Sequence, residues 1–466
     1  MLNPTIISFL VFMGISTFIG LLSAMKKRNT TEDYLLASRD VGPWAMALSC
    51  VASNNSGFMF VGLIGTTYLG GLSTIWIMIG WIFGDYFTWF FVHKNLREQS
   101  EALNAKTIPS MIATSKNGKS LLVSAIAGII LVAFLGTYSA AQFKAGSKAL
   151  HVLFGWDYST GAILGATITV LYCLAGGIRA SIWTDVYQSV VMIVSISFLC
   201  FTAFAEIGGV SELLPQLRAI DPSLTNLIPE NLQFGFALYA LGWAAAGIGV
   251  VGQPHIMVRA MVIESSDMIK RARRIYVIWY VLFTAGAILT GLLCRIIIPE
   301  LASFDPELAL PRLSQVLLPQ VFVGFILAGL FSASMSTADS QILSCSAAIT
   351  HDIFRVSDSH SLKANKLATL LIACVALFIA LSGSQNVFTL VVLAWSGLAS
   401  TLGPLVILRS LRVSVGNVTS ILMMFSGLSC ILIWRFVLGY SGAIYDALPG
   451  MAASFLVFGL SRLIRR

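Results

Sequence analysis

Charged residues are scarce in this sequence of 466 residues: Asp, Glu, Lys and Arg make up 11% of it, whereas hydrophobic residues make up 57%. A soluble domain has about 25% charged residues, so this composition excludes an ordinary water-soluble fold. Apolar runs of about 20 residues recur along the chain, and each is long enough to cross a hydrocarbon core of about 30 Å as a helix. Only helices or closed barrels satisfy their backbone in lipid, and continuous apolar runs indicate helices. We therefore predict an all-α integral membrane protein.

Residues that build metal centres, disulfides and nucleotide sites are equally sparse. The five histidines lack the spacing of metal ligands, and the seven cysteines fall in apolar runs with no Cys-x-x-Cys pair. The segment 115–120 ends like a phosphate-binding loop, but Ala113 stands where that motif needs its first glycine. These observations favour neither an enzyme nor an ATP-driven pump, so we expect an ion gradient to supply the energy.

Hydropathy predicts about 13 membrane spans. They lie near residues 4–25, 41–66, 68–93, 121–148, 158–176, 183–206, 233–258, 275–299, 319–349, 365–382, 387–408, 414–434 and 443–461. The first run is too long for the core of a signal peptide, and it is followed rather than preceded by a basic cluster. We therefore expect the first span to remain as an anchor.

Basic residues distinguish the two sides of the predicted membrane protein. Most Lys and Arg residues fall on one side, in the segments 26–39, 94–119, 179, 259–274, 355–366, 409–412 and 462–466. The positive-inside rule makes this side cytoplasmic. Loops on the opposite side are acidic, near residues 206–230 and 300–307. We therefore expect a multi-pass cell-membrane protein with its amino terminus outside and its carboxyl terminus inside. Its net charge of +8 requires no nucleic-acid partner.

Three carboxylates, Asp85, Asp185 and Asp339, fall inside predicted spans, where an unpaired charge is costly. Asp339 shares one helical face with Ser336 and Ser340 at i, i+3 and i+4 spacing. The two hydroxyls and the carboxylate offer the oxygen ligands that a hard cation such as sodium prefers. Helix packing would explain the two serines alone. It does not explain Asp339, so we favour an ion site. Asp85 lies near the cytoplasmic end of its span, where we expect a solvated or capped side chain.

Two predicted spans contain segments that weaken a helix. The second span holds the run Ala52-Ser53-Asn54-Asn55-Ser56-Gly57, which is rich in poor helix formers. In the seventh span, three glycines lead into the sequence Gln253-Pro254-His255. Glycines often serve packing alone, an explanation that suits the second segment better than the first. Paired interruptions in corresponding halves are typical of inverted-repeat transporters, whose unwound backbone faces solute and ion.

Several motifs resemble those of the sodium/solute symporter family over nearly the whole chain. They are Gly176-Gly177-Ile178-Arg179 with Trp183-Thr184-Asp185 and Gln188, Gly252-Gln253-Pro254-His255 with Arg259, Met335-Ser336-Thr337, and Ala394-Trp395-Ser396-Gly397 with Gly403-Pro404. The resemblance implies a leucine-transporter-like core of two five-helix inverted repeats at residues 41–410. An extra helix and the first cytoplasmic loop would occupy residues 1–40, and two further helices residues 411–466.

The resemblance also implies two sodium sites. The common site maps to the carbonyls of Ala52, Asn55 and Ala333 and the hydroxyls of Ser336 and Thr337. A second site, which some members have, maps to Asp185, Ser336, Asp339 and Ser340. Two of the three carboxylates found above, Asp185 and Asp339, belong to this second set.

Solute contacts are implied by the same resemblance at Ser53, Asn54, Ser56, Gly57, Trp76, Tyr138, Gln142, Gln253 and Pro254. The chain departs from the proline-carrying members of the family in two places. Those members have an acidic residue where this chain has Asn54. Their Trp and Tyr ahead of the Gly-Gln-Pro-His motif have no clear equivalents in residues 244–251. The substrate is therefore not fixed as proline by the resemblance.

We expect a sodium-coupled symporter that imports a small organic solute, such as proline or a related metabolite, by alternating access. Sodium ions, the solute and membrane lipid are the expected partners, and no obligate protein partner is evident. Proton coupling is an alternative, because Asp185 and Asp339 could carry protons. A transporter-like ligand sensor is a further alternative.

Overall fold

The computed structural model describes residues 3–115, 118–300, 305–382 and 386–464. Its first half contains α1 (Pro4–Leu22), α2 (Thr31–Leu36), α3 (Pro43–Gly57), α4 (Ile64–Gly70), α5 (Ile75–Phe91), α6 (His93–Ala102), α7 (Ile108–Ala113), α8 (Leu121–Phe154), α9 (Tyr158–Glu206) and α10 (Leu213–Ile220). Its second half contains α11 (Gly235–Ile248), α12 (Pro254–Val262), α13 (Ile269–Ile297), α14 (Ala309–Leu317), α15 (Gln320–Ala347), α16 (Asp358–Ser382), α17 (Val387–Thr401), α18 (Gly403–Ser410), α19 (Asn417–Leu432) and α20 (Ala447–Ile464). A short antiparallel pair, β1 (Thr114–Ser115) and β2 (Gly118–Lys119), precedes α8.

The predicted all-α membrane architecture is confirmed, but the number of 13 spans is not. In the described ranges, ten helices are long and apolar enough to cross a membrane, or eleven if the bent pair α17 and α18 forms one span. Two of the ten, Pro43–Phe91 and Tyr158–Glu206, are 49 residues long. Each of them covers two of the predicted spans, because the helix continues through a bend where hydropathy had suggested an end.

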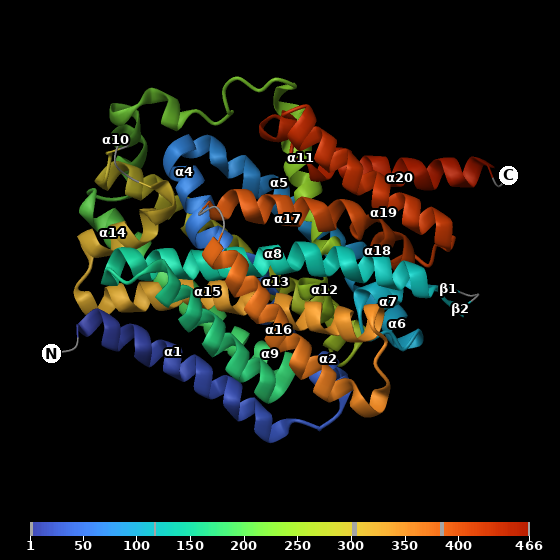
Figure 1. Cartoon of the computed structure of the whole chain (residues 1–466). Coiled ribbons are helices and arrows are strands. Elements are labelled where there is room, and N and C mark those ends of the chain that lie inside the picture. The colour runs from blue at the N-terminus through green and yellow to red at the C-terminus, as the bar shows by residue number, and fades with distance from the viewer. Residues whose placement is uncertain (1–2, 116–117, 301–304, 383–385, 465–466) are drawn as a thin grey trace.

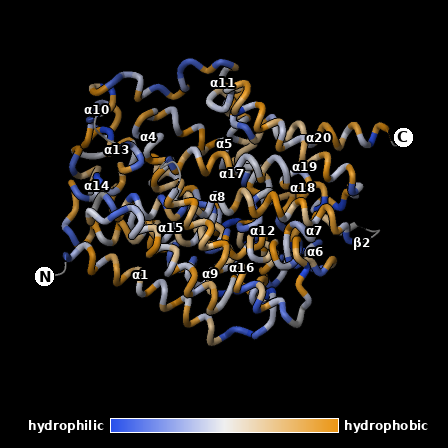
Figure 2. Tube along the Cα trace, in the orientation of Figure 1, coloured by the Kyte–Doolittle hydropathy of each residue, from blue (hydrophilic) through white to orange (hydrophobic). Residues whose placement is uncertain are grey.

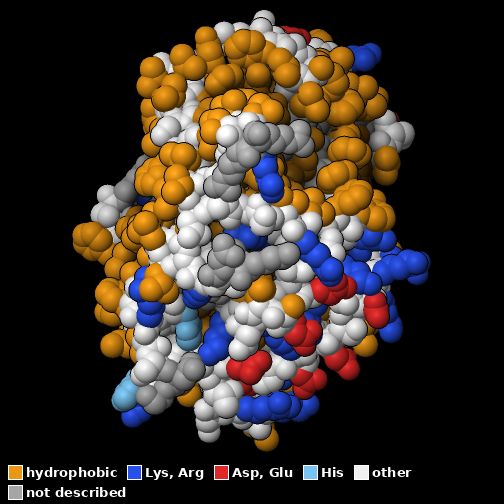
Figure 3. All heavy atoms as spheres, turned by 90° about the vertical axis from the view of Figure 1, so that its right-hand side faces the viewer, with side chains coloured by type: hydrophobic (Ala, Val, Ile, Leu, Met, Phe, Trp, Pro, Cys, Tyr) orange, Lys and Arg blue, Asp and Glu red, His pale blue; other side chains and the backbone are white. Residues whose placement is uncertain are grey.

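The long helices lie side by side and run between two ends of the molecule. In Figure 1, α8, α15 and α17 cross the view, and the amino and carboxyl termini lie at opposite ends. Hydrophobic residues dominate the helices, whereas hydrophilic residues concentrate in the connections at the ends (Figure 2). The end that carries α6, α7 and the β-pair presents a gathering of Lys and Arg side chains (Figure 3). Outward-facing Phe83, Phe201 and Phe378 are about 70% exposed, as expected for side chains that contact lipid.

Both predicted helix breaks are present. Within α3, Ser56 takes a left-handed backbone conformation (φ 51°, ψ 175°), and a π-helical turn, Phe58–Leu63, leads on to α4. In the other half, α11 gives way to a tight turn, Gly249–Gly252, before α12 begins at Pro254. Proline suits the first position of a helix, because it has no N–H to leave unpaired there. The two interruptions place irregular backbone inside the helix bundle.

A glycine seam, formed by Gly84 of α5 and Gly247 of α11, joins these two helices. A Cβ atom at Gly84 would lie 2.0 Å from the carbonyl oxygen of Ala244, and one at Gly247 would lie 2.0 Å from that of Trp81. Any larger side chain would collide with backbone. The two glycines therefore let the two helix backbones touch, as small residues commonly do between membrane helices.

The segment after α1, which includes the short helix α2, is held against α9 by hydrogen bonds to Asp33. The Asp33 carboxylate accepts hydrogen bonds from Arg179 Nη2 (2.6 Å), the Arg28 backbone (2.8 Å) and Ser38 Oγ (2.8 Å). Burial by itself would raise the pKa of Asp33, but these hydrogen bonds and the Arg179 charge outweigh it and lower the pKa below 3.8. The bend of α9 at Gly177 (φ 58°) makes room for this segment, since a Cβ there would lie 2.4 Å from the Tyr34 carbonyl oxygen.

Candidate sodium and solute site

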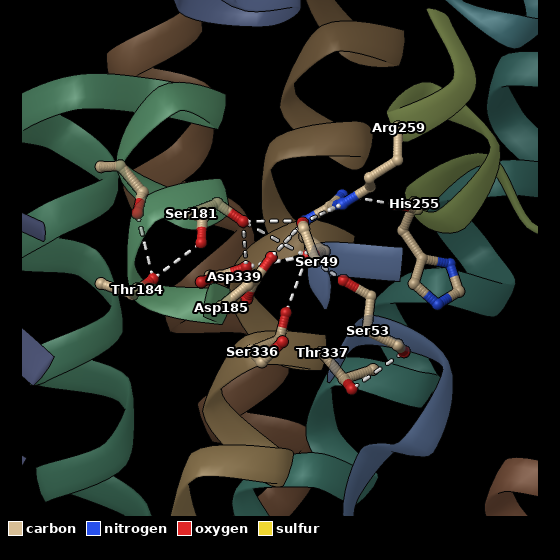
Figure 4. Close-up of polar contacts among 12 residues, drawn as sticks. Ser49, Ser53, Ser181, Thr184, Asp185, His255, Arg259, Ser336, Thr337 and Asp339 are labelled. Carbon is tan, nitrogen blue, oxygen red and sulfur yellow. Dashed lines mark hydrogen bonds and ion pairs between the residues drawn. The ribbon is translucent and has the colours of Figure 1, made fainter. Parts of the chain in front are cut away.

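The broken helix α3 packs against α15 at the residues predicted for the first sodium site. Thr337 Oγ1 donates to the backbone oxygens of Ser53 and Ala333, each at 3.1 Å. Ser336 is fully buried, and its Oγ has no hydrogen-bond partner among the described residues. Hydroxyl and backbone oxygens belong to the class of ligand that sodium prefers. Ser53, Ser336 and Thr337 lie together at this junction (Figure 4), and the sodium site there stays a prediction.

The second predicted ion site brings together side chains from α9 and α15. Asp339 accepts hydrogen bonds from Tyr172 OH (2.7 Å), Ser181 Oγ (2.7 Å) and Ser340 Oγ (2.8 Å). Asp185 Oδ2 accepts one from Ser49 Oγ of α3 at 2.5 Å. Asp185 and Asp339 are completely buried, so both carboxylates of the predicted second site lie in the core, and their role as an ion site stays a prediction.

A basic side chain, Arg259, reaches into this second group from α12 (Figure 4). Its Nη2 lies 3.1 Å from Asp185 Oδ2 and donates to Ser181 Oγ at 2.8 Å and to Ser340 Oγ, while its Nε donates to Ser49 Oγ at 3.1 Å. The placement of Arg259 in a cytoplasmic loop was wrong, since its side chain is fully buried. The short helix α12 carries the guanidinium inward, where two carboxylates compensate its charge.

This group holds two carboxylates but one guanidinium. Across the described ranges, Arg259 is the single basic side chain within 4 Å of either Asp185 or Asp339. With both carboxylates ionised, the guanidinium would leave one excess negative charge, and Asp185 Oδ1 has no hydrogen-bond partner in the described chain. A buried excess charge is costly. The group therefore has the charge and a free oxygen for one further monovalent cation.

Several predicted solute residues meet at the α3 break. The Gly57 N–H donates to Gln142 Oε1 of α8 at 2.7 Å, and Tyr138 OH donates to Ser56 Oγ at 3.3 Å. The Tyr138 ring also meets the His255 ring edge-on, with centroids 5.8 Å apart. The break of α3 is thus joined by α8 to the residues just after the break between α11 and α12.

Asn54, Gln253 and Trp76 have different surroundings. Asn54 Nδ2 donates to Tyr276 OH at 2.6 Å, and Gln253 Nε2 donates to the Trp395 carbonyl oxygen at 3.1 Å. The structure does not bring Trp76 to the break, because its Nε1 donates to the loop carbonyl of Leu227 at 2.9 Å and its ring packs against Phe236.

A pocket leads from one end of the molecule to Arg259 and Ser340. Its lining includes Lys106 and Thr107, from the segment predicted to be cytoplasmic, and Pro254 and Ser340 deeper in. Arg259 and Ser340 of the second ion group therefore line a pocket that they share with residues of the predicted cytoplasmic side.

Sequence reasoning missed three serine and tyrosine partners of this group, Ser49, Ser181 and Tyr172, and the role of Arg259. One signal was available for Arg259, which lies one helical turn after His255 in an apolar segment. A charged residue at that position would have to find an internal partner. The hydroxyl partners carry no comparable signal, because serine is common in packed membrane helices.

A family model described as the sodium:solute symporter family matches residues 34–415. The chain belongs to this family. It is 32% identical to the high-affinity proline transporter PutP of Bacillus subtilis, over 94% of both chains. It is also 31% identical to sodium/proline symporter 2 of Staphylococcus saprophyticus, over 97% of this chain and 91% of the relative. The protein is therefore a transporter rather than an enzyme.

Solved structures show the same fold. The substrate-bound outward-open state of a Na+-coupled sialic acid symporter matches with a TM-score of 0.82 and 17% identity, over 97% of this chain and 96% of that one. A closed conformation of the nucleobase-cation-symport transporter Mhp1 matches with a TM-score of 0.58 and 14% identity, over 92% and 94%. The present chain therefore has a leucine-transporter-like architecture.

Proposed function

We propose that this protein imports a small organic solute, such as proline, together with sodium by alternating access. The observation that carries the proposal is the junction of the α3 break with α15, where Thr337 Oγ1 donates to the Ser53 backbone oxygen. The family is one of sodium-coupled symporters, and relatives above 30% identity are named as proline transporters. Sodium at this junction would hold the broken helix against α15, and the solute would bind beside the break.

The sodium gradient supplies enough free energy for accumulation. One sodium ion that moves down a potential of about 100 mV releases roughly 2.3 kcal/mol, and a tenfold concentration gradient adds about 1.4. Together these would sustain a solute gradient of a few hundredfold if one ion accompanies each solute.

Residues 41–410 would form the transport core, with residues 1–40 and 411–466 as additions at its two ends. The end with the gathered Lys and Arg side chains would face the cytoplasm (Figure 3). The amino terminus would then lie outside and the carboxyl terminus inside.

Uptake into proteoliposomes tests the proposal. The purified protein should accumulate radiolabelled L-proline under an inward sodium gradient and should stop when the gradient is collapsed. A panel of amino acids, small carboxylates and sugars tests the substrate class in the same vesicles. Accumulation that is equal with sodium and with choline would refute sodium coupling.

Proton coupling is the second candidate, and the excess negative charge of the Asp185 and Asp339 group favours it. A proton would neutralise that charge as well as sodium would. An imposed pH gradient without sodium should then drive uptake, and its failure to do so would eliminate this candidate.

A further inference from the structure

Asp85 of α5 is a buried carboxylate outside both predicted ion sites. The expectation that it is solvated was wrong, since the residue is only 1% exposed, whereas the alternative of a side chain held by hydrogen bonds agrees with its contacts. Its Oδ2 atom accepts hydrogen bonds from Tyr276 OH of α13 and, at 3.4 Å, from Asn54 Nδ2 of α3. Thr88 Oγ1 lies 3.5 Å from Oδ1. Asp85 therefore lies between three membrane helices, directly beside the α3 break.

No basic group pairs with Asp85 in the part of the chain that the structure describes. None of the ion pairs found there, with N–O distances up to 4.0 Å, involves it. Its neighbours donate neutral hydrogen bonds, which favour the ionised form of a carboxylate, whereas burial among three helices favours the neutral form. A cationic group at this place would stabilise the ionised form, and the described residues provide none within ion-pair distance.

Asn54 connects this carboxylate to the solute region. Its side-chain nitrogen donates to Tyr276 OH at 2.6 Å, whereas its Oδ1 atom is buried and has no hydrogen-bond partner among the described residues. A carboxylate oxygen and an amide oxygen would therefore be available together to an incoming cation. Ser53, the preceding residue, contacts Thr337 and Ser340 of α15 instead. The two neighbouring side chains of α3 thus serve two different groups.

Aromatic rings surround the same place. The Tyr276 ring stacks on Tyr280 with centroids 5.4 Å apart and lies 4.8 Å from the Trp89 ring. Trp81, one helical turn before Asp85, packs against Trp395 at 4.6 Å, and its buried Nε1 has no partner within the described ranges. Ring faces attract cations, most strongly where water is excluded. These surroundings suit a small cation held by a carboxylate.

We propose that Asp85 and Asn54 form a cation-binding subsite that Tyr276 positions beside the α3 break. The ligand is a monovalent cationic group, supplied either by the ammonium of an amine-bearing solute or by a coupling sodium ion. This inference rests on the proposed transport function and adds to it a second anionic group, separate from that of Asp185 and Asp339. It makes Asp85 the residue that distinguishes an amine from its uncharged analogue, or one that binds a further ion.

The test uses Asp85→Asn in the full-length protein, with Asp352→Asn as the matched control. Asp352 is also fully buried and accepts hydrogen bonds from Thr107 and Ser124 (2.7 Å each), but it lies at the end of the molecule that carries the basic loops. The first arm measures L-proline uptake and its inhibition by tetrahydrofuran-2-carboxylate, in which an ether oxygen replaces the amine. The second arm measures binding of 22Na+ to the purified protein.

An ammonium subsite predicts that Asp85→Asn raises the KM for proline at least tenfold, while inhibition by the oxygen analogue and 22Na+ affinity stay near those of the parent. A sodium subsite predicts instead that the variant binds less 22Na+ per protein or needs more sodium for half-saturation. The proposal is overturned if proline KM, analogue inhibition and 22Na+ binding all stay within twofold of the parent in a monodisperse variant.

Two further measurements keep the outcomes separate. If Asp85→Asn does not fold, Tyr276→Phe removes the hydroxyl that holds Asp85 but keeps the ring, and it should move the same measured quantity. If the parent does not transport proline, the assignment of proline as substrate is wrong. The binding of 22Na+ to the parent and to Asp85→Asn then decides whether Asp85 binds a cation. Sodium-independent uptake by the parent would refute the coupling mechanism, yet it would leave the comparison of proline with its analogue valid.

Discussion

Replacement of Arg259 by Gln should create a protein whose stability depends strongly on sodium. The parent holds Arg259 Nη2 at 3.1 Å from Asp185 Oδ2, with both side chains fully buried. Removal of one partner from a buried ion pair costs about 3–5 kcal/mol, because the other charge stays buried and uncompensated. In Arg259→Gln, both Asp185 and Asp339 would lack a basic partner.

Sodium should recover much of this loss if the oxygens around Asp185 and Asp339 form a cation site. An ion that binds only the folded state stabilises it by about 2.7 kcal/mol at 100 times its Kd. That amount is a large part of the expected penalty. The melting temperature of Arg259→Gln should therefore fall well below that of the parent in choline chloride and rise steeply as sodium replaces choline.

The assay is thermal unfolding of detergent-purified protein at constant ionic strength, with sodium exchanged for choline. Arg409→Gln is the matched control, because Arg409 is also buried but donates to the backbone oxygens of Ile112 (3.0 Å) and Val415 (3.2 Å). The parent and this control should show a smaller shift, because Arg259 already compensates part of the negative charge in both proteins. An equal sodium shift in all three proteins would refute the view that Arg259 occupies part of a cation site.

Three further predictions follow from the described contacts. Ser336→Ala and Thr337→Ala should each raise the sodium concentration for half-maximal uptake several-fold at unchanged protein abundance, because each removes a hydroxyl ligand. Unchanged sodium dependence in the double variant would exclude this site. The pKa of Asp33 is lowered in the folded state, so its ionised carboxylate stabilises the fold at neutral pH, and this stabilisation is lost as pH falls through the folded pKa. The melting temperature of Asp33→Asn should therefore be lower than that of the parent at neutral pH, and the two should converge in acid. A difference that stays constant with pH would contradict the assignment. Gly247→Ala should lower the melting temperature, since its Cβ would lie 2.0 Å from a backbone oxygen. The control Gly136→Ala should not, because a Cβ there meets no atom within 4 Å. Equal effects of the two variants would contradict the close helix contact.

The sequence predicts those features of the fold that depend on local composition. The break at residues 52–57 follows from the weak helix propensity of Asn, Ser and Gly, and the ion-site face of Ser336, Asp339 and Ser340 follows from helical spacing alone. The number of 13 spans stays unconfirmed, because Pro43–Phe91 and Tyr158–Glu206 each form one helical stretch of 49 residues where hydropathy separates two spans. Family motifs added the partners of these features, including Tyr138 and Gln142 at the break.

Contacts between distant segments were beyond the reach of the sequence. Arg259 and Asp185 are far apart in the chain, and only the inward direction of α12 makes them an ion pair. The position of Asp85 near the cytoplasmic end of its predicted span suggested a solvated side chain, but α3 and α13 cover it. Trp76 was assigned to the solute by resemblance, yet its indole bonds a loop carbonyl. In each case, tertiary packing decides the environment of a side chain whose local sequence is compatible with several.

The glycine seam between α5 and α11 sets a mechanical limit on the transport cycle. At Gly84 and Gly247 backbone meets backbone, so at these two positions no side chain can change rotamer to let one helix slide along the other. We therefore expect the two helices to move together, with Asp85 on one of them and the Gly249–Gly252 turn at the end of the other. The α3 junction with α15 has no such seam and relies on hydrogen bonds, which exchange readily with water and ions. Motion would thus be concentrated at the α3 junction with α15, and the joint movement of α5 and α11 would affect both helix breaks together.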